Sequence, residues 1–127
     1  MIAIGVGANS RAQADDFAAA IASICAETNG DVIATFEKAP FANSLKTAAS
    51  EQSIAFRELS LAELRERNGD CRTRSQRTLD LFGVVSLAEA SALAAAGAGS
   101  RLLMPRRIIG NITIAAAKSA DAEESPQ

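Results

Sequence analysis

The sequence contains no histidine, no tryptophan and no tyrosine among its 127 residues. Histidine is the most common general base, the usual partner of a nucleophilic serine and the usual ligand of transition metals. Its absence leaves carboxylates, Lys, Ser, Thr, Cys and backbone groups to carry any chemistry, and we expect neither a metal site nor a cofactor. The scarcity of aromatic rings suits alanine-rich helices that pack closely on a small sheet.

Cysteine is also scarce, and long apolar runs are missing. Cys25 and Cys71 stand far apart and neither belongs to a CxxC pair, so the sequence signals neither a disulfide framework nor a zinc site. No apolar run reaches the roughly 20 residues that a membrane span needs. The first residues enter an apolar run without a charged leader. We therefore expect a cytoplasmic protein with no membrane partner.

The charge is small overall but unevenly distributed. A net charge of -2 and an isoelectric point near 5.1 argue against a nucleic-acid partner. Residues 101–118 nevertheless contain no acid and four basic residues, which are Arg101, Arg106, Arg107 and Lys118. A basic region is therefore hidden under an acidic average.

Short apolar runs alternate with helical patterns along the first half of the chain. We expect strands at residues 2–6, 31–36 and 53–59. A helix follows each strand: the first from Ser10 to about Glu27, the second from Asn43 or Ser44, and the third over 61–67. This order predicts a parallel sheet with helices on its faces.

The second half predicts two more helices and two more strands. The helices are expected over 76–83 and from Ser86 to Gly97, and the strands over 100–104 and 111–117. Residues 105–110 form a short connection, which favours an antiparallel pair. The predicted fold class is α/β: a three-layer α/β/α sandwich with a mixed, mostly parallel five-stranded sheet whose last strand is antiparallel. We expect one domain over residues 1–118 and a disordered acidic tail over 119–127.

Three residue pairs have the spacing of a capping box. In this motif a side chain at the helix N-cap and a Glu or Gln three residues later bond each other's backbone N–H groups. The pairs are Ser10 with Gln13, Ser60 with Glu63, and Ser86 with Glu89. Each pair predicts where a helix begins.

Gly5 and Gly7 stand where the first strand turns toward a helix, in the stretch IGVGANSR. A dinucleotide fingerprint needs a third glycine, where this chain has Ser10, and an acid earlier than Glu37. A P-loop needs a Gly-Lys-Ser/Thr sequence that does not follow. The two glycines therefore favour a simple turn. The start of the next helix, reinforced by Arg11, could still take an anion such as a carboxylate.

Two arginine-bearing segments follow expected strands or precede expected helices. The segment CRTRSQR places Arg72, Arg74 and Arg77 around Thr73 and Ser75. Arginine pairs bidentately with carboxylate or phosphate, although solvated arginines are common in such loops. We also consider a lowered thiol pKa for Cys71 among these arginines.

The segment MPRRIIGN adds Arg106 and Arg107 at one end of the sheet. Open α/β sheets bind ligands at the carboxyl ends of their strands, so the two basic segments favour a ligand with several negative charges. Lys38, beside Glu37 after the second strand, could contact an anion, take part in acid/base chemistry or form a surface ion pair.

Several segments, taken in order, resemble one family, the cobalamin biosynthesis CobE/CbiG C-terminal domains. They are IAIGVGANSRAQADDF, ATFEKA, TRSQRTLDLFGVVSLAEASALAAAG and LLMPRRIIGNITIAAAK. The second half carries the more specific motifs, and the likeness covers nearly the whole chain except the tail. The family fold is a three-layer α/β/α domain with a mixed sheet, which agrees with the element order.

The resemblance implies a role in corrin-ring synthesis. A free-standing domain is similar to the CobE form, so we expect a carrier or accessory factor that binds a corrinoid or precorrin intermediate, with other cobalamin biosynthesis enzymes as further partners. The positions that match the family motifs give the expected contacts: Gly7, Ser10, Arg11, Lys38, Thr73, Arg74, Ser75, Arg106 and Arg107. Many family members have a lysine where this chain has Arg106, which removes a potential nucleophile.

Two functional hypotheses follow. In the first, the protein binds the intermediate by its carboxylates and passes it between enzymes. In the second, it is an enzyme acting on that intermediate, such as a lactone-opening hydrolase, with Glu37 or Glu89 as base and Thr73 or Ser75 positioning a water. A place in a capping box would explain Glu89 without catalysis.

Overall fold

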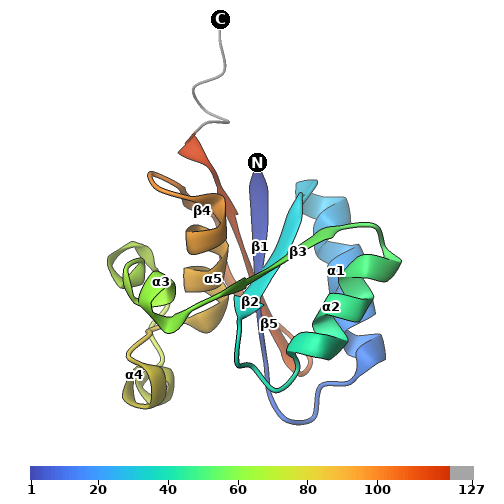
Figure 1. The fold of residues 1–127 in the computed structure, drawn as a ribbon, viewed down its shortest axis with the longest axis horizontal. Helices are drawn as coiled ribbons and strands as arrows, with labels where there is room; N and C mark the ends of the chain where they lie inside the picture. Colours follow the sequence, from blue (N-terminus) through green and yellow to red (C-terminus); the bar gives the residue numbers. More distant parts are fainter. Residues whose placement is uncertain (121–127) are drawn as a thin grey trace, which may run out of the picture.

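The computed structural model describes residues 1–120, which form one five-stranded sheet with helices on both faces (Figure 1). The strands are β1 (Ile2–Ala8), β2 (Val32–Phe36), β3 (Ala55–Leu59), β4 (Arg101–Ile109) and β5 (Ile112–Lys118). The helices are α1 (Ala14–Thr28), α2 (Ala42–Glu51), α3 (Leu61–Arg65), the 3-10 turn η1 (Asn68–Asp70), α4 (Gln76–Phe82) and α5 (Leu87–Ala96). The predicted α/β sandwich is confirmed.

The strand order is β3-β2-β1-β5-β4. The β1-β2 and β2-β3 pairs are parallel, whereas β5 is antiparallel to both of its neighbours, β1 and β4. β4 therefore points the same way as β1, and β5 alone runs against the other strands, as predicted. Because Ala8 pairs with Ile112, the β4–β5 turn lies at the edge of the sheet where β1, β2 and β3 end.

Helix α5 packs directly on strand β1. Its residues from Ala88 to Leu93 are all buried, because alanine-rich helices can approach a sheet closely. The contact is closest at Gly5, where an added Cβ would lie 1.8 Å from the Ala88 carbonyl oxygen. Gly5 is therefore needed for helix packing.

The opposite face of the sheet is covered by α1 and α2 (Figure 1). Apolar residues recur along α1 at helical spacing, with Phe17, Ile21 and Ile24 buried against the sheet. The rings of Phe17 and Phe41 stack with their centroids 5.4 Å apart, which joins α1 to the start of α2. The structure thus has two apolar cores, one on each side of the sheet.

The predicted capping boxes have different outcomes. Ser60 and Glu63 form the predicted box. The Ser10–Gln13 box is wrong: Gln13 is itself the N-cap and forms a box with Asp16. The turn extends further than predicted because the Asn9 side chain accepts a hydrogen bond from the Arg11 N–H at 2.8 Å. The helix can begin only after this turn.

The expected connection over residues 105–110 is also wrong, because β4 continues to Ile109. The register of β4 on β5 shifts between Met104 and Arg107, so Pro105 lies in an irregular part of an edge strand. Proline is tolerated there because no ladder hydrogen bond needs its missing N–H. The turn itself centres on Gly110, which has a φ of 59°.

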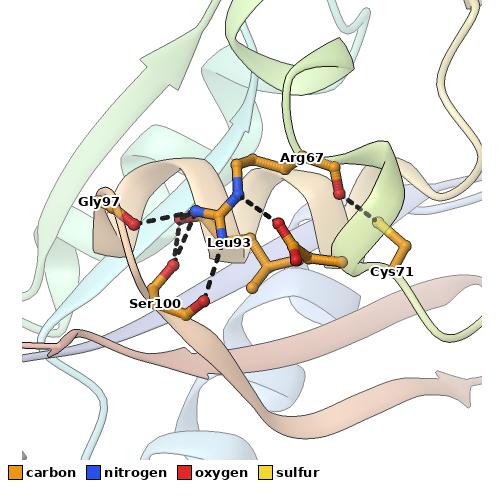
Figure 2. Close-up of polar contacts among 6 residues, drawn as sticks. Arg67, Cys71, Leu93, Gly97 and Ser100 are labelled. Carbon is orange, nitrogen blue, oxygen red and sulfur yellow. Dashed lines mark hydrogen bonds and ion pairs between the residues drawn. The ribbon is translucent and has the colours of Figure 1, made fainter.

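Arg67 fastens the segment after α3 to the end of α5 (Figure 2). Its guanidinium donates to the carbonyl oxygens of Leu93, Gly97 and Ser100 at 2.8–2.9 Å, and to the Ser100 hydroxyl at 2.8 Å. Its Nε also pairs with Asp70 at 3.0 Å. One side chain thus adds hydrogen bonds to carbonyl groups at the end of α5 and in the turn that follows it.

The described chain continues past the expected domain boundary at residue 118. Ser119 is buried, and its hydroxyl accepts a hydrogen bond from the N-terminal amino group at 3.0 Å. Residues 121–127 of the expected tail lie outside the described residues. Within residues 1–120 no single helix is long and apolar enough to cross a membrane. Helices α4 and α5 taken together have the length and composition of a span, but a 64° bend separates them.

Candidate functional site

A cleft of about 500 Å³ lies at the carboxyl end of β1. It is bounded by the loop after β1, by α4, by the first turn of α5 and by the neighbouring strands β4 and β5. The lining residues are Gly7, Ala8, Asn9, Ser10, Arg77, Thr78, Leu81, Phe82, Ser86, Leu87, Ala88, Arg106 and Thr113. The loop after β1, helix α4 and strand β4 therefore meet at one place.

The floor of the cleft is open because Gly7 has no side chain. A Cβ at this position would lie 2.6 Å from the Thr113 hydroxyl oxygen. The loop above is fixed to the β4–β5 turn by two hydrogen bonds from Asn9 to Asn111, one between side chains at 3.0 Å and one between backbones at 3.1 Å. The loop therefore needs no ligand to hold its position.

Two arginines, Arg77 and Arg106, are the charged residues among those that line the cleft, and the lining includes no Asp or Glu. They come from different walls, one from α4 and one from β4. Leu81, Phe82 and Leu87 add apolar surface, and the Leu81 side chain is 62% exposed. A site of this kind suits a ligand that combines negative charges with an apolar body.

Glu89 lies behind the cleft and is fully buried. Its Oε1 accepts the backbone N–H groups of Arg72 and Thr73 at 2.7 and 2.9 Å. Its Oε2 accepts the Arg106 N–H at 2.7 Å and the Thr73 hydroxyl. The Ser86 side chain caps α5 by accepting the Glu89 N–H. The Glu89 carboxylate does not accept the Ser86 N–H in exchange, so only half of the predicted third capping box is formed.

Burial by itself would raise the pKa of Glu89. The hydrogen bonds from the Thr73 hydroxyl and from the backbone N–H groups outweigh this effect and hold the pKa below its ordinary value. A buried carboxylate that is ionised and already accepts four hydrogen bonds has little capacity to accept a proton from a substrate. The geometry therefore does not suit Glu89 as a general base.

Three of the predicted contact residues, Gly7, Ser10 and Arg106, line the cleft together. Thr73 and Ser75 lie near it, but the fold uses their side chains. Thr73 bonds Glu89, and the Ser75 hydroxyl caps α4 by accepting the Thr78 N–H at 3.3 Å.

The other predicted contact residues do not line this cleft. Arg11, Lys38 and Arg74 are exposed and lie outside its lining. Arg107 extends over the opposite face of the sheet, where it forms a bidentate pair with Glu27 of α1 at 2.8 and 2.9 Å. This pair lowers the pKa of the Glu27 carboxyl through the hydrogen bond and charge of Arg107.

The sequence-based list of contacts omits one wall of the cleft, which α4 forms. Arg77, Thr78, Leu81 and Phe82 line it, and their spacing puts them on one side of a helix. That spacing was the available signal. Arg77 belongs to the basic segment CRTRSQR and is absent from the predicted contacts, and the structure places it in α4, within the helix expected over 76–83.

Other hollows and nucleophiles fit an anion site less well. A hollow of about 310 Å³ borders Phe41 and Ser44 on the other side of the loop after β1. Another, of about 490 Å³, is lined by three acids, Glu63, Glu66 and Asp70, beside Arg67. The lowered thiol pKa considered for Cys71 is wrong, because burial, together with the charges of Glu89 and Asp70, raises the pKa of this thiol to about 12.

Comparison with known proteins points in one direction. Residues 2–117 match the family described as cobalamin synthesis G C-terminus. No curated protein matches the chain. Among solved structures, the cobalamin biosynthesis protein chiG from Agrobacterium tumefaciens is 30% identical, with a TM-score of 0.70 over 95% of this chain and 100% of that one.

Two further structures share the fold at lower identity. CobE, a protein from the cobalamin (vitamin B12) biosynthetic pathway, is 24% identical, with a TM-score of 0.80 over 92% of each chain. A cobalamin biosynthesis protein G homologue from Sulfolobus solfataricus is also 24% identical, with a TM-score of 0.63 over 94% of this chain and 36% of that one. The fold thus occurs both alone and as part of a longer chain.

Proposed function

Because this chain belongs to the cobalamin synthesis G C-terminal family, we propose that the cleft between α4 and β4 binds a corrin-ring intermediate by its side-chain carboxylates. Family and structural neighbours make the chain a cobalamin biosynthesis protein. The proposal adds the ligand, its binding site and the role of carrier.

The observation that supports this proposal is the pairing of Arg77 and Arg106 across a cleft whose lining includes no acid. Corrin-ring intermediates have a flat apolar face surrounded by acetate and propionate side chains. A guanidinium can hold each carboxylate through two parallel hydrogen bonds. The apolar side chains of Leu81 and Phe82 can then cover part of the ring.

Binding without chemistry fits the groups around the cleft. Glu89 is ionised and saturated with donors, and the Cys71 thiol has a pKa of about 12. We therefore propose a carrier that shields the intermediate and passes it to other enzymes of the pathway. Both cysteines are free thiols, which fits the reducing cytoplasm as the place of action.

A direct test is titration of the full chain with cobyrinic acid, a corrinoid whose side-chain carboxylates are free. The matched ligand is a corrinoid with amidated side chains, which keeps the ring and loses the charges. The ligand's absorbance reports binding cleanly, because the protein has no Trp or Tyr. We expect saturable binding of the acid, weaker binding of the amide, and a loss of affinity as salt increases.

Incubation of the bound complex then separates a carrier from an enzyme. A carrier returns the same corrinoid after long incubation, whereas a hydrolase yields a product that is detected by mass spectrometry. Equal affinity for the acid and the amide would contradict recognition through carboxylates. Binding of NAD or ATP with no binding of any corrinoid or precorrin would overturn the proposed function.

A further inference from the structure

The two arginine-bearing walls of the cleft are both attached to one buried side chain, Glu89. Its carboxylate accepts N–H groups from Arg72 and Thr73 on one side and from Arg106 on the other. These segments are far apart in the sequence, and the glutamate itself belongs to a third element, α5. Its carboxylate is the hydrogen-bond acceptor that two segments share, and it joins both of them to α5.

On one side, the Arg72–Thr73 segment leads into α4. Ser75, two residues after Thr73, donates its backbone N–H to the Val85 carbonyl at 2.8 Å and caps the helix that carries Arg77. No α4 residue is fully buried. The Phe82 ring packs against Phe36 at the far end of the helix, so the first turn, which carries Arg77, depends on the segment before it for its position. A shift of the Arg72–Thr73 segment would therefore move Arg77.

On the other side, the contact explains the irregularity in β4. Arg107 pairs with Ile114 and Met104 with Ala116, so Pro105 and Arg106 together face a single residue of β5. In a bulge of this kind one backbone group leaves the ladder. The Arg106 N–H turns to Glu89 at 2.7 Å, and the Arg106 side chain lines the cleft.

A carboxylate fits this place better than any other side chain. It offers two oxygens that only accept, and four donors point at them. A glutamine has one such oxygen, and its amide N–H₂ would face a backbone N–H. Its neutral oxygen would also form weaker hydrogen bonds than an ionised carboxylate does.

We propose that Glu89 is the positioning residue of the cleft: its carboxylate joins the Arg72–Thr73 segment to the bulge at Arg106 and so sets the separation of the two arginines that bind the corrinoid. This inference rests on the proposed function for its ligand. It assigns to Glu89 no contact with the ligand and no proton transfer.

The first test measures, in the absence of any corrinoid, whether Glu89 holds the two segments in place. Amide hydrogen exchange is measured on the wild type and on Glu89→Gln, with Glu63→Gln as the matched control. Glu63 also follows a helix-capping serine by three residues, but its partners, Ser60 at the start of α3 and Arg57 of β3, do not line the cleft. We expect the Arg72, Thr73 and Arg106 amides to lose protection in Glu89→Gln and to keep it in Glu63→Gln.

Chemical rescue separates an anchoring carboxylate from a residue that merely fills space. In Glu89→Ala, added formate can occupy the same nest of donors, and we expect it to restore protection of these amides, whereas chloride at equal ionic strength does not. Thr73→Val, which removes only the hydroxyl donor, is the milder variant should Glu89→Ala fail to fold. We expect a smaller loss of protection at the same amides.

The second test measures cobyrinic acid affinity of the same variants. We expect Glu89→Gln to bind about tenfold more weakly, as is typical when a residue that orients a binding group is replaced, and Glu63→Gln to bind like the wild type. Wild-type affinity in Glu89→Gln, or unchanged amide protection in that variant, would overturn the positioning role. Absence of binding by the wild type would instead overturn the proposed function, while the amide results still decide whether Glu89 is the anchor.

Discussion

Replacing Gly5 by alanine tests how closely helix α5 packs on strand β1. An added Cβ would lie 1.8 Å from the Ala88 carbonyl oxygen and 2.6 Å from the Ala92 nitrogen. Both atoms are backbone atoms of a helix whose side chains around them are buried. Neither atom can rotate away, so the whole helix must move.

The size of the effect follows from this geometry. The Ala88 oxygen would have to retreat by about 1.6 Å to reach the 3.4 Å of an ordinary contact. Overpacking of a core costs about 1–3 kcal/mol, and a shift of this size in a rigid helix belongs at the upper end. Alanine is about 0.5–1 kcal/mol better than glycine within a strand. The expected net loss is about 2 kcal/mol.

Gly7→Ala is the matched control on the same strand. Its Cβ would meet the Thr113 hydroxyl oxygen at 2.6 Å, and this side chain can rotate. We therefore expect stability within about 1 kcal/mol of the wild type. Because Gly7 forms the floor of the cleft, the same substitution should weaken corrinoid binding.

Far-UV circular dichroism is the appropriate assay, because the chain has no Trp or Tyr for intrinsic fluorescence. A loss of about 2 kcal/mol lowers the Tm of a domain of this size by about 6–10 °C. A Gly5→Ala protein that melts within about 2 °C of the wild type would refute the close packing of α5 on β1.

Three further predictions concern groups away from the cleft floor. With a thiol pKa of about 12, Cys71 should react with iodoacetamide much more slowly than free cysteine at mild alkaline pH; an equal rate, followed by mass spectrometry of the labelled peptide, would contradict its burial. Arg67→Met removes the donors to Leu93, Gly97 and Ser100. The free energy of unfolding, measured by chemical denaturation, should fall by about 3 kcal/mol. A loss below about 1 kcal/mol would show that water replaces these donors. Because folding lowers the pKa of Glu89, the ionised carboxylate stabilises the fold fully above the ordinary carboxyl pKa, and this stabilisation is lost as the pH falls through the pKa of the folded state. The difference in unfolding free energy between wild type and Glu89→Gln should therefore shrink in acid. A difference that stays constant with pH would contradict an ionised Glu89.

Hydrophobic periodicity was sufficient to predict the architecture. The buried strands, the amphipathic α1 and the alanine-rich α5 each have the pattern of their element, and the alternation predicts the parallel half of the sheet. Element ends were less predictable, because local side chains decide them. The Asn9 side chain extends the first turn, and the Arg106 N–H bonds Glu89 where the sequence suggested a loop.

The site was predicted only in part, because sequence position does not say which face of the sheet a side chain occupies. Arg106 and Arg107 are adjacent, yet one lines the cleft and the other pairs with Glu27 on the opposite face. Thr73 has the residue type of a ligand contact, but its hydroxyl is bound to a glutamate distant in the sequence. Contacts of that kind follow from the tertiary fold and leave no local pattern.

The central claim is that Arg77 and Arg106 bind corrinoid carboxylates across the cleft. Its most direct test compares two double variants that remove the same charge, Arg77→Ala/Arg106→Ala and Arg74→Ala/Arg107→Ala, in titration with cobyrinic acid. The account predicts that the first variant loses saturable binding and that the second binds like the wild type. Equal affinities of the two variants would contradict it, because general attraction by positive charge would then explain the binding.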